Sequence, residues 1–263
     1  MLKLAENPCL GDTAKTATTE YTIRVDDLCK VFGKIKAVDH LSFAVPAGST
    51  CALLGANGAG KTTTLSMLLG LLLPTSGSIR ILGVDMVRDR FDALPRMNFT
   101  SPYVDLPQRL SVFQNLDIYA RLYGIRRPKT RILQLAEELT LTDFLKRPYG
   151  SLSAGQRTRV SLAKSLLNEP DVLLMDEPTA SLDPASAGTI RDYLRRYQQY
   201  SGATILLASH NMQEVERLCE NVFIMKQGRI VDQGSPVELL EKYGRETLEQ
   251  VFIDISRDEN ALL

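Results

Sequence analysis

The order of apolar and polar positions near the N-terminus predicts strands that lead into a glycine-rich loop. Residues 21–25 alternate between polar and apolar side chains, residues 41–45 form a second strand-like run, and residues 49–54 are apolar up to a glycine cluster. The composition of residues 61–73 suits a helix, and another short strand follows at residues 78–82. The predicted order is therefore strand, glycine loop, helix, strand.

The middle of the chain is typical of helices and the second half of buried strands. Residues 111–144 repeat Leu, Ile, Tyr and Ala at spacings of three and four, which predicts several helices. Residues 171–175 and 204–208 are compact apolar runs followed by polar residues, as buried parallel strands often are. We also expect a surface helix at 184–200, a hairpin of 222–225 and 229–232 around a turn at 226–228, and a mainly helical tail from Pro236.

Composition indicates an ordinary globular protein with one large α/β domain, or one such domain with a helical insertion. Hydrophobic residues make up 44% of the chain and charged residues 24%, so the chain can bury a substantial core. Lys plus Arg and Asp plus Glu each number 31, so the formal net charge is zero. Because a nucleic-acid binder usually carries a basic excess, we expect no nucleic-acid partner larger than a mononucleotide.

The cysteines and the N-terminus indicate a protein of the cytosol. Cys9, Cys29, Cys51 and Cys219 show no C-x-x-C spacing, so we expect reduced and mostly structural thiols. Residues 1–19 lack the apolar core of a signal peptide or anchor and are expected to form a loose tail. The longest apolar runs fall short of the roughly 20 residues that cross a bilayer, so work at a membrane would need a partner.

Residues 55–62, Gly-Ala-Asn-Gly-Ala-Gly-Lys-Thr, match the phosphate-loop pattern G-x-x-x-x-G-K-[ST] between an apolar strand and a helix. Glycines let backbone N–H groups turn inward around a phosphate, and the following helix presents its positive end to the anion. Lys61 would reach the β- and γ-phosphates, and Thr62 would offer its hydroxyl to Mg²⁺. A glycine turn beside an incidental lysine is the alternative. The residues expected to bind nucleotide here are Gly55, Asn57, Gly58, Ala59, Gly60, Lys61, Thr62 and Thr63.

A second apolar strand ends in Asp176-Glu177, where P-loop enzymes place an acidic residue linked to Mg²⁺. We expect Asp176 to hold Mg²⁺ through water. Glu177 could orient or deprotonate the attacking water, a role typically worth about 10² to 10⁴ in rate. Taken alone, an acidic pair after a strand is more often a solvated turn. The phosphate loop in the same chain favours the catalytic interpretation.

Further motifs follow in a fixed order, namely Leu-Ser-Ala-Gly-Gln at 152–156, Ser-Leu-Asp at 181–183, and His210 behind an apolar strand. With these motifs the chain resembles the ATP-binding subunits of ABC transporters, over about residues 21–236. The resemblance implies a P-loop NTPase core with an N-terminal antiparallel β subdomain and a helical insertion subdomain. It implies an N-terminal tail at 1–19, an ATP-binding domain at 20–240 with its helical subdomain at about 103–165, and a C-terminal helical extension at 241–263.

In that family the segment that corresponds to 152–156, here called the signature segment, contacts the γ-phosphate of ATP bound to the opposite subunit. Ala154 replaces the usual first glycine of the pair, which adds only a methyl group. Ser153, Gly155 and Gln156 are the expected ATP-binding residues, helped by the dipole of the helix that follows. An isolated Ser-Ala-Gly would be an ordinary helix N-cap.

The resemblance assigns three further residues. Asp183 would belong to the loop that links the two active sites, and His210 would hydrogen-bond the γ-phosphate and the water. A lone His after a strand is usually structural, so this role depends on the family match. Phe32 occupies the position of the aromatic ring that stacks on adenine, and a plain core Phe is the open alternative.

One loop departs from the family. Aligning residues 110–112 with the usual Leu-Thr-Val places Pro102, or else Ser101, where a glutamine normally reaches Mg²⁺ and touches the membrane partner. Gln108 and Gln114 lie nearby but out of register. Ser101 could still bind a metal-bound water and the loop could still couple to a partner, while the glutamine's own role is left unassigned.

The resemblance implies an ATPase that uses ATP and Mg²⁺ and closes as a dimer, with a homodimer expected, when nucleotide binds. Its partner would be a membrane-spanning permease, which places the chain peripherally on the cytoplasmic face of the cell membrane. The rival interpretations are a soluble relative acting in translation or DNA repair, which usually carries two ATP-binding units or a coiled coil, and a free-standing metabolic kinase, which leaves the signature segment unexplained.

Two segments bear on the direction of transport. Residues 247–252, Thr-Leu-Glu-Gln-Val-Phe, and residues 211–216, Asn-Met-Gln-Glu-Val-Glu, resemble segments of ATPases from type-2 ABC exporters. Export is therefore favoured. An amphipathic C-terminal helix that merely packs on its own domain would give the same pattern. The residues that choose the transported substrate would lie in the membrane subunit.

Overall fold

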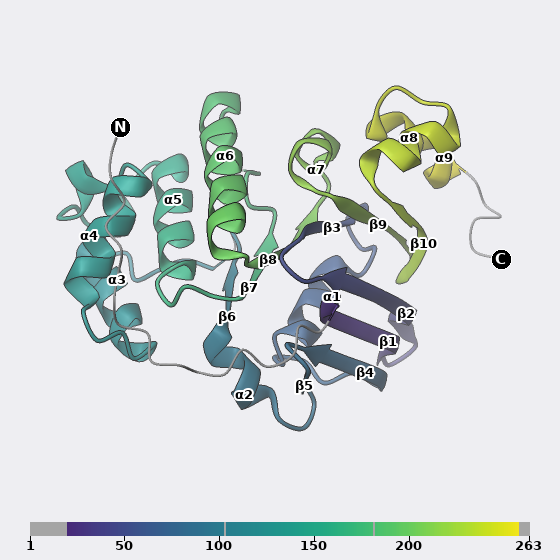
Figure 1. Cartoon of the computed structure of the whole chain (residues 1–263), viewed down its shortest axis with the longest axis horizontal. Coiled ribbons are helices and arrows are strands. Elements are labelled where there is room, and N and C mark those ends of the chain that lie inside the picture. The colour runs from purple at the N-terminus through teal and green to yellow at the C-terminus, as the bar shows by residue number, and fades with distance from the viewer. Residues whose placement is uncertain (1–19, 103, 181, 258–263) are drawn as a thin grey trace.

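The computed structural model describes residues 20–102, 104–180 and 182–257 (Figure 1). The predicted tail at 1–19, with Cys9, lies outside these residues. The described chain contains two β-sheets with helices packed around them, which confirms the predicted α/β class. Among the described helices, none combines the length and the apolar character needed to cross a membrane.

The larger sheet has six strands in the order β10-β9-β3-β8-β7-β6. Neighbours from β9 to β6 pair in parallel, and β10 joins β9 as an antiparallel edge. The two apolar runs predicted to be parallel strands are therefore confirmed as such, and they lie side by side as β7 and β8. In chain order the strands are β3 Thr50–Leu54, β6 Met97–Thr100, β7 Val172–Asp176, β8 Thr204–Ser209, β9 Asn221–Lys226 and β10 Arg229–Gly234.

The smaller sheet is antiparallel, as the predicted N-terminal β subdomain requires, with the order β2-β1-β4-β5. Strand β1 runs well beyond the predicted residues 21–25. Register shifts around Leu28, and a positive φ of 50° at Asp27, break the strict alternation that identifies a strand in sequence. The strands are β1 Tyr21–Phe32, β2 Ile35–Pro46, β4 Ser76–Ile81 and β5 Val84–Asp85.

The helices α3, α4 and α5 gather at one end of the molecule, on the left of Figure 1, and α8 and α9 lie at the other end, beside β10. Helix α1 ends at Leu68 rather than at the predicted Leu73, because Gly70 adopts a left-handed φ of 67° that stops the helix. The helices are α1 Lys61–Leu68, α2 Arg90–Ala93, α3 Val112–Leu122, α4 Pro128–Glu138, α5 Ala154–Ser165, α6 Pro184–Ser201, α7 Met212–Leu218, α8 Pro236–Tyr243 and α9 Leu248–Arg257, with 3-10 turns at Leu94–Arg96, Thr142–Phe144 and Tyr149–Ser151.

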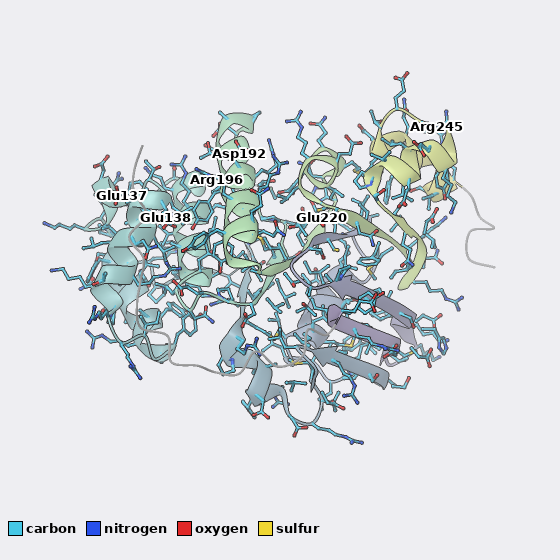
Figure 2. The ribbon with its side chains drawn as sticks, viewed as in Figure 1. Glu137, Glu138, Asp192, Arg196, Glu220 and Arg245 are labelled. Atoms are coloured by element: carbon cyan, nitrogen blue, oxygen red, sulfur yellow. The ribbon has the colours of Figure 1, made fainter. Side chains whose placement is uncertain are left out.

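Charged side chains extend outward from the helices at both ends of the molecule (Figure 2). Glu137 and Glu138 lie on α4, and Asp192 and Arg196 lie on the exposed face of α6. Arg245 follows α8 and forms an ion pair with α9, with its Nε 2.7 Å from an Asp254 carboxylate oxygen. The apolar stripes of these helices therefore face inward, as amphipathic helices on a globular core require.

The six-stranded sheet separates two hydrophobic cores. Along β7, Leu173 and Met175 join the core shared with the helical end, and Val172 and Leu174 join the core between the two sheets. All of these side chains are almost completely buried. Because successive strand residues point to opposite faces, burial on both faces explains why this strand is a continuous apolar run. The residues at its carboxyl end are consequently held on a rigid strand.

Candidate active site

The phosphate loop connects β3 to α1, as the motif predicts. Gly60 has a φ of 102°, and a Cβ atom there would lie 2.5 Å from the Ala37 carbonyl oxygen. A Cβ at Gly55 would lie 2.7 Å from the carbonyl oxygen of Met225. Both positions therefore require glycine, one for its backbone conformation and both for lack of space. The loop fits closely against β2 and β9.

Lys61 is buried at the start of α1. Its Nζ donates to the carbonyl oxygens of Gly55 at 2.6 Å and Ala56 at 3.1 Å. Burial lowers the pKa of Lys61, while the carboxylates of Glu177 and Asp176 act in the opposite direction. The ammonium group is thus held inside the loop, beside the backbone N–H groups that suit a phosphate.

Asp176 is the last residue of β7 and is 3% exposed. Burial, and next the neighbouring charge of Glu177, raise its pKa, while Lys61 and a hydrogen bond from the Thr62 side chain lower it. Within residues 20–102, 104–180 and 182–257, two buried carboxylates therefore lie near one lysine, Lys61, an arrangement that favours an additional cation. The Thr62 hydroxyl and the Asp176 carboxylate offer the oxygen ligands that Mg²⁺ prefers.

Glu177 follows β7 in a left-handed backbone conformation, with a φ of 48°. Non-glycine residues rarely adopt this conformation, and they do so where the surrounding structure imposes it. Here the Glu177 N–H donates to the Ala208 carbonyl at 2.9 Å. The backbone turn at the end of β7 is therefore held by the adjacent strand β8, and the Glu177 side chain is buried beside the end of that strand.

His210 directly follows β8 and lies against Glu177. Its Nδ1 is 2.5 Å from Glu177 Oε1, and its backbone N–H donates to the same oxygen at 3.1 Å. The side chain of His210 is 57% exposed, so the ring also faces outward. The residues that the structure brings together at the carboxyl ends of β3, β7 and β8, called here the phosphate-binding edge, are Lys61, Thr62, Asp176, Glu177 and His210.

Ser101 is the polar one of the two residues, Pro102 and Ser101, that the sequence offers for the family's glutamine position. It is buried and lines a small pocket that also contains Asp176 and Glu177. Gln114 instead accepts a bond from the Ser111 N–H, at 2.9 Å, as part of the cap of α3. Gln108 bonds to Asp105. Both candidates from the sequence, Ser101 and Pro102, therefore line the pocket with the two carboxylates, and of these two only Ser101 has a polar side chain.

Phe32 ends β1 with 47% of its surface exposed. The Nζ of Lys30 lies 5.0 Å from the centre of its ring. The alternative of a core phenylalanine is therefore wrong. The ring is partly open to solvent, and the Lys30 ammonium lies over it.

The signature segment is engaged in capping its own helix. The Ser153 hydroxyl accepts from the Gln156 N–H at 3.3 Å, and Gln156 Oε1 accepts from the Ser153 N–H at 3.0 Å, forming a capping box on α5. Ser153 is exposed. Within the described part of the chain, no hydrogen bond joins either side chain to the phosphate loop. The N-cap anticipated as the simpler alternative is thus present.

Asp183 plays a similar local part at the start of α6. Its Oδ1 accepts from the backbone N–H groups of Ala185 at 3.1 Å and Ser186 at 3.0 Å. A hydrogen bond from the Ser186 side chain lowers the pKa of Asp183 most, and the backbone N–H groups of Ser186 and Ala185 lower it further. The aspartate is exposed and therefore remains charged at the molecular surface.

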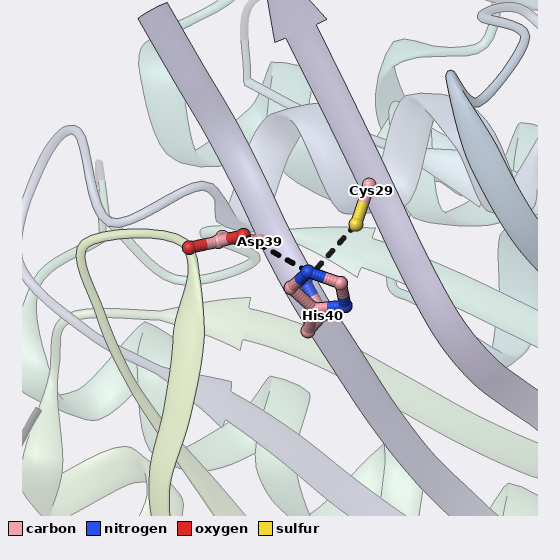
Figure 3. A group of neighbouring side chains, drawn as sticks. All are labelled: Cys29, Asp39 and His40. Carbon is pink, nitrogen blue, oxygen red and sulfur yellow. Dashed lines mark hydrogen bonds and ion pairs between the residues drawn. The ribbon is translucent and has the colours of Figure 1, made fainter. Parts of the chain in front are cut away.

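A separate group of side chains, Cys29, Asp39 and His40, lies on the long strands β1 and β2 (Figure 3). Asp39 Oδ2 accepts two bonds from Arg229, at 2.9 and 2.8 Å, and Lys36 Nζ lies 3.3 Å from Oδ1. The Arg229 bond is the main cause of the lowered pKa of Asp39. Because two cations already neutralise this carboxylate, we interpret the group as an ion-pair network that fastens β2 to β10.

The sequence did not predict a buried polar network behind Glu177. Ser209, the residue before His210, is 0% exposed, and Glu214 on α7 is 1% exposed. Both carry polar side chains within otherwise apolar surroundings. In the sequence, Glu214 is the third helical residue after the N-cap Asn211. A glutamate at that position predicts a capping role and gives no indication of a buried network.

Comparison with known proteins gives the family. The family model described as ABC transporter matches residues 38–180, more than half of the chain. The chain belongs to this family. As an ABC ATPase it binds and hydrolyses ATP, so the predicted family, fold and enzymatic class are confirmed.

Three relatives of this ABC ATPase share a third or more of its residues. The Nod factor export ATP-binding protein I of Ralstonia nicotianae is 40% identical over 83% of the chain and 68% of its own length. The bacitracin transport ATP-binding protein BcrA of Bacillus licheniformis is 36% identical over 86% and 74% of the two chains. NatA of Bacillus subtilis, an ABC transporter ATP-binding protein, is 34% identical over 89% and 95%.

Solved structures agree with the fold. An ATP-binding subunit of an ABC transporter superimposes with a TM-score of 0.80 and 25% identity, over 90% of this chain and 100% of that one. The cbiO1 protein of Clostridium perfringens, described as part of the transporter complex cbiONQ, superimposes with a TM-score of 0.76 and 28% identity, over 93% and 98%. The ABC ATPase is thus built on the fold of known transporter ATP-binding subunits.

Proposed function

We propose that this ABC ATPase powers export of a substrate through a membrane-spanning permease, and that it does so as one of two identical subunits that close on ATP. Members of the family work with permeases and dimerise. The relatives named for Nod factor export and bacitracin transport support export. Helix α9, at the segment that resembles exporter ATPases, packs on its own chain through Leu248, Val251 and Ile255, so this helix alone does not favour export.

The observation that carries the dimer is the division of the site within one chain. The phosphate-binding edge is assembled from β3, β7 and β8, whereas the signature segment only caps its own helix. A second chain in the opposite orientation would place its Ser153 hydroxyl and its Gly155 N–H on the γ-phosphate. ATP would then join two chains, and loss of the γ-phosphate would remove those contacts.

Within one site, each residue has a role that its chemistry suits. Lys61 and the loop N–H groups would bind the phosphates, and Phe32 would stack on adenine. Glu177 would orient and deprotonate water, with His210 holding one oxygen of Glu177 and reaching the γ-phosphate. Asp183 would carry contacts between the two sites.

The residues present also fit a magnesium ion. Thr62 and Asp176 would hold it, directly or through water, and Ser101 would contact its water shell. When bound, Mg²⁺ would neutralise charge on the β- and γ-phosphates.

Complementation between two inactive variants tests the composite site. Lys61→Ala disables the phosphate loop, and Ser153→Arg places a bulky cation in the signature segment. Each variant alone should lack ATPase activity. A mixture should regain activity. In a dimer of one variant with the other, one of the two ATP sites combines an intact phosphate loop with an intact signature segment. If the mixture stays inactive although each variant is folded, the shared-site proposal fails.

The membrane partner is tested separately. We propose that the chain lies peripherally on the cytoplasmic face of the membrane, attached to the permease. Tagged protein purified from gently solubilised native membranes should bring a stoichiometric multi-span protein, identified by mass spectrometry. Recovery only from the soluble fraction, together with ribosomes or repair factors, would instead support a soluble relative.

A further inference from the structure

The network behind Glu177 joins three chain segments through side-chain hydrogen bonds. Thr179 Oγ1 donates to Glu214 Oε1 at 2.8 Å, and Ser209 Oγ donates to Glu214 Oε2 at 3.1 Å. The same Ser209 hydroxyl lies 3.4 Å from Glu177 Oε2. Glu214 is 1% exposed, so these side chains supply the hydrogen bonds that water would otherwise provide.

Ser209 has one hydroxyl proton and faces two carboxylates. The backbone N–H of Asn211 donates to Ser209 Oγ at 3.0 Å and fixes the position of that oxygen. The contact with Glu214 is shorter than the contact with Glu177, so the proton points toward Glu214. The side chain at position 214 therefore determines whether Glu177 receives a hydrogen bond from Ser209.

A buried carboxylate on α7 is costly unless it is hydrogen-bonded. Burial raises the pKa of Glu214, and the charge of Glu177 acts in the same direction, while Thr179, Ser209 and Arg191 lower it. The neighbours Val215 and Leu218 show that apolar side chains pack at this face of the helix. Packing alone would thus be served by an apolar residue at position 214.

We propose that Glu214 is a positioning residue for ATP hydrolysis, which acts on Glu177 through the hydroxyl of Ser209. The inference rests on the proposed role of Glu177 as the base. While Glu214 accepts the Ser209 proton, Glu177 Oε2 keeps its lone pairs for water, and His210 holds the other oxygen. A neutral donor at position 214 turns the Ser209 proton toward Glu177 Oε2, so Ser209 occupies a lone pair that would otherwise accept a hydrogen bond from water.

Glu214→Gln tests this directly, because glutamine keeps the size of the side chain and can donate to Ser209 through its amide. The expected result is a fall in kcat of roughly three- to tenfold, the scale of one redirected hydrogen bond. The KM for ATP should stay within about twofold, since the base does not bind the nucleotide. Thermal unfolding should show a folded protein.

The same substitution in a Ser209→Ala background separates positioning from packing. Without the hydroxyl, Glu214→Gln should change kcat by less than about twofold, because the route to Glu177 is missing. An equal loss in both backgrounds would overturn the proposal, and so would a raised KM with unchanged kcat. If Glu214→Gln does not fold, Glu214→Asp replaces it, and its shorter carboxylate should give the same dependence on Ser209.

Glu138→Gln is the matched control for the change in chemistry. Glu138 lies on α4, far along the chain from this network, and its Oε2 accepts a bond from the Tyr193 hydroxyl at 2.8 Å. Its kcat should equal that of the unmodified protein. Glu177→Gln separates the two proposals: normal turnover in that variant refutes the role of Glu177, whereas an inactive Glu177→Gln beside an unaffected Glu214→Gln refutes only the role of Glu214.

Discussion

The phosphate-binding edge and the signature segment carry equally specific motifs, yet their side chains are used in different ways. At the edge, Glu177 and His210 contact each other across two strands, and Lys61 lies within its own loop. In the signature segment, the side chains of Ser153 and Gln156 each accept only from the other residue's backbone N–H among the described residues. The phosphate-binding edge is assembled from segments far apart in the sequence, whereas the side-chain bonds of the signature segment stay within four consecutive residues.

This difference shows that a motif can be structurally satisfied without being functionally complete. The capping box removes the cost of unpaired N–H groups at the start of α5, so the helix is stable in a single chain. The same hydroxyl faces solvent and can donate its proton to a phosphate. In the proposed dimer, the second subunit would therefore meet a surface that is already folded, and binding would need no rearrangement of α5.

The largest effect is expected at the edge. Glu177→Gln should lower the ATPase rate by about 10² to 10⁴, because an amide cannot accept the proton of the attacking water. ATP should still bind and should hold two subunits together as a stable dimer. Turnover assays and light scattering with ATP measure both consequences. Normal turnover would remove Glu177 from the mechanism.

Lys61→Ala should act earlier, on nucleotide binding. Loss of one charged hydrogen bond to phosphate should reduce the free energy of ATP binding by about 1.5 to 3 kcal/mol. The affinity for ATP should therefore fall by roughly tenfold to a hundredfold. Fluorescent-nucleotide titration measures the dissociation constant. An unchanged affinity would contradict the assignment of the phosphate loop.

Ser153→Ala sharpens the comparison because the chain contains a matched control. Ser111 caps α3 with the same box, with Gln114 as its partner. Each alanine should cost about 1 kcal/mol of stability. Only Ser153→Ala, and not Ser111→Ala, should also weaken ATP-dependent dimerisation and lower the ATPase rate. Equal ATPase rates in the two variants would show that Ser153 acts only as a helix cap.

The smallest effect concerns Lys164, on the same helix as the signature segment. Its Nζ donates to Asn98 Oδ1 at 3.2 Å and to the Phe99 carbonyl at 3.0 Å, and burial lowers its pKa to about 8. Between about pH 8 and its ordinary value, the unfolded chain binds more protons than the folded chain, so stability should rise with pH across this window.

Denaturant unfolding of Lys164→Met measures this contribution. The free energy of unfolding of the variant should depend less on pH across that window than that of the unmodified protein. An identical pH dependence of the two proteins would show that Lys164 does not titrate there.

The sequence predicted the order of the main strands, the phosphate loop and the acidic end of β7, because each depends on local pattern. It did not predict β6 as a strand, since Met97–Thr100 is only four residues long and mixes polar with apolar side chains. Glu214 was missed as a site residue for a different reason. Its partners Thr179 and Ser209 lie 35 and 5 positions away, and only the pairing of β7 with β8 brings them together.

Two backbone hydrogen bonds connect β2 to the phosphate loop through the turn between β9 and β10, and they make this part of the molecule rigid. The Asp39 N–H donates to the Gly228 carbonyl, and the Gly228 N–H donates to the Ala59 carbonyl, each near 3 Å. The hairpin that ends at Phe32 is therefore braced against the loop that contains Lys61. If a nucleotide binds Phe32 through its base and Lys61 through its phosphates, both binding positions would move as one rigid body when two subunits close. Closure would then displace the partner instead of bending the chain between the two positions.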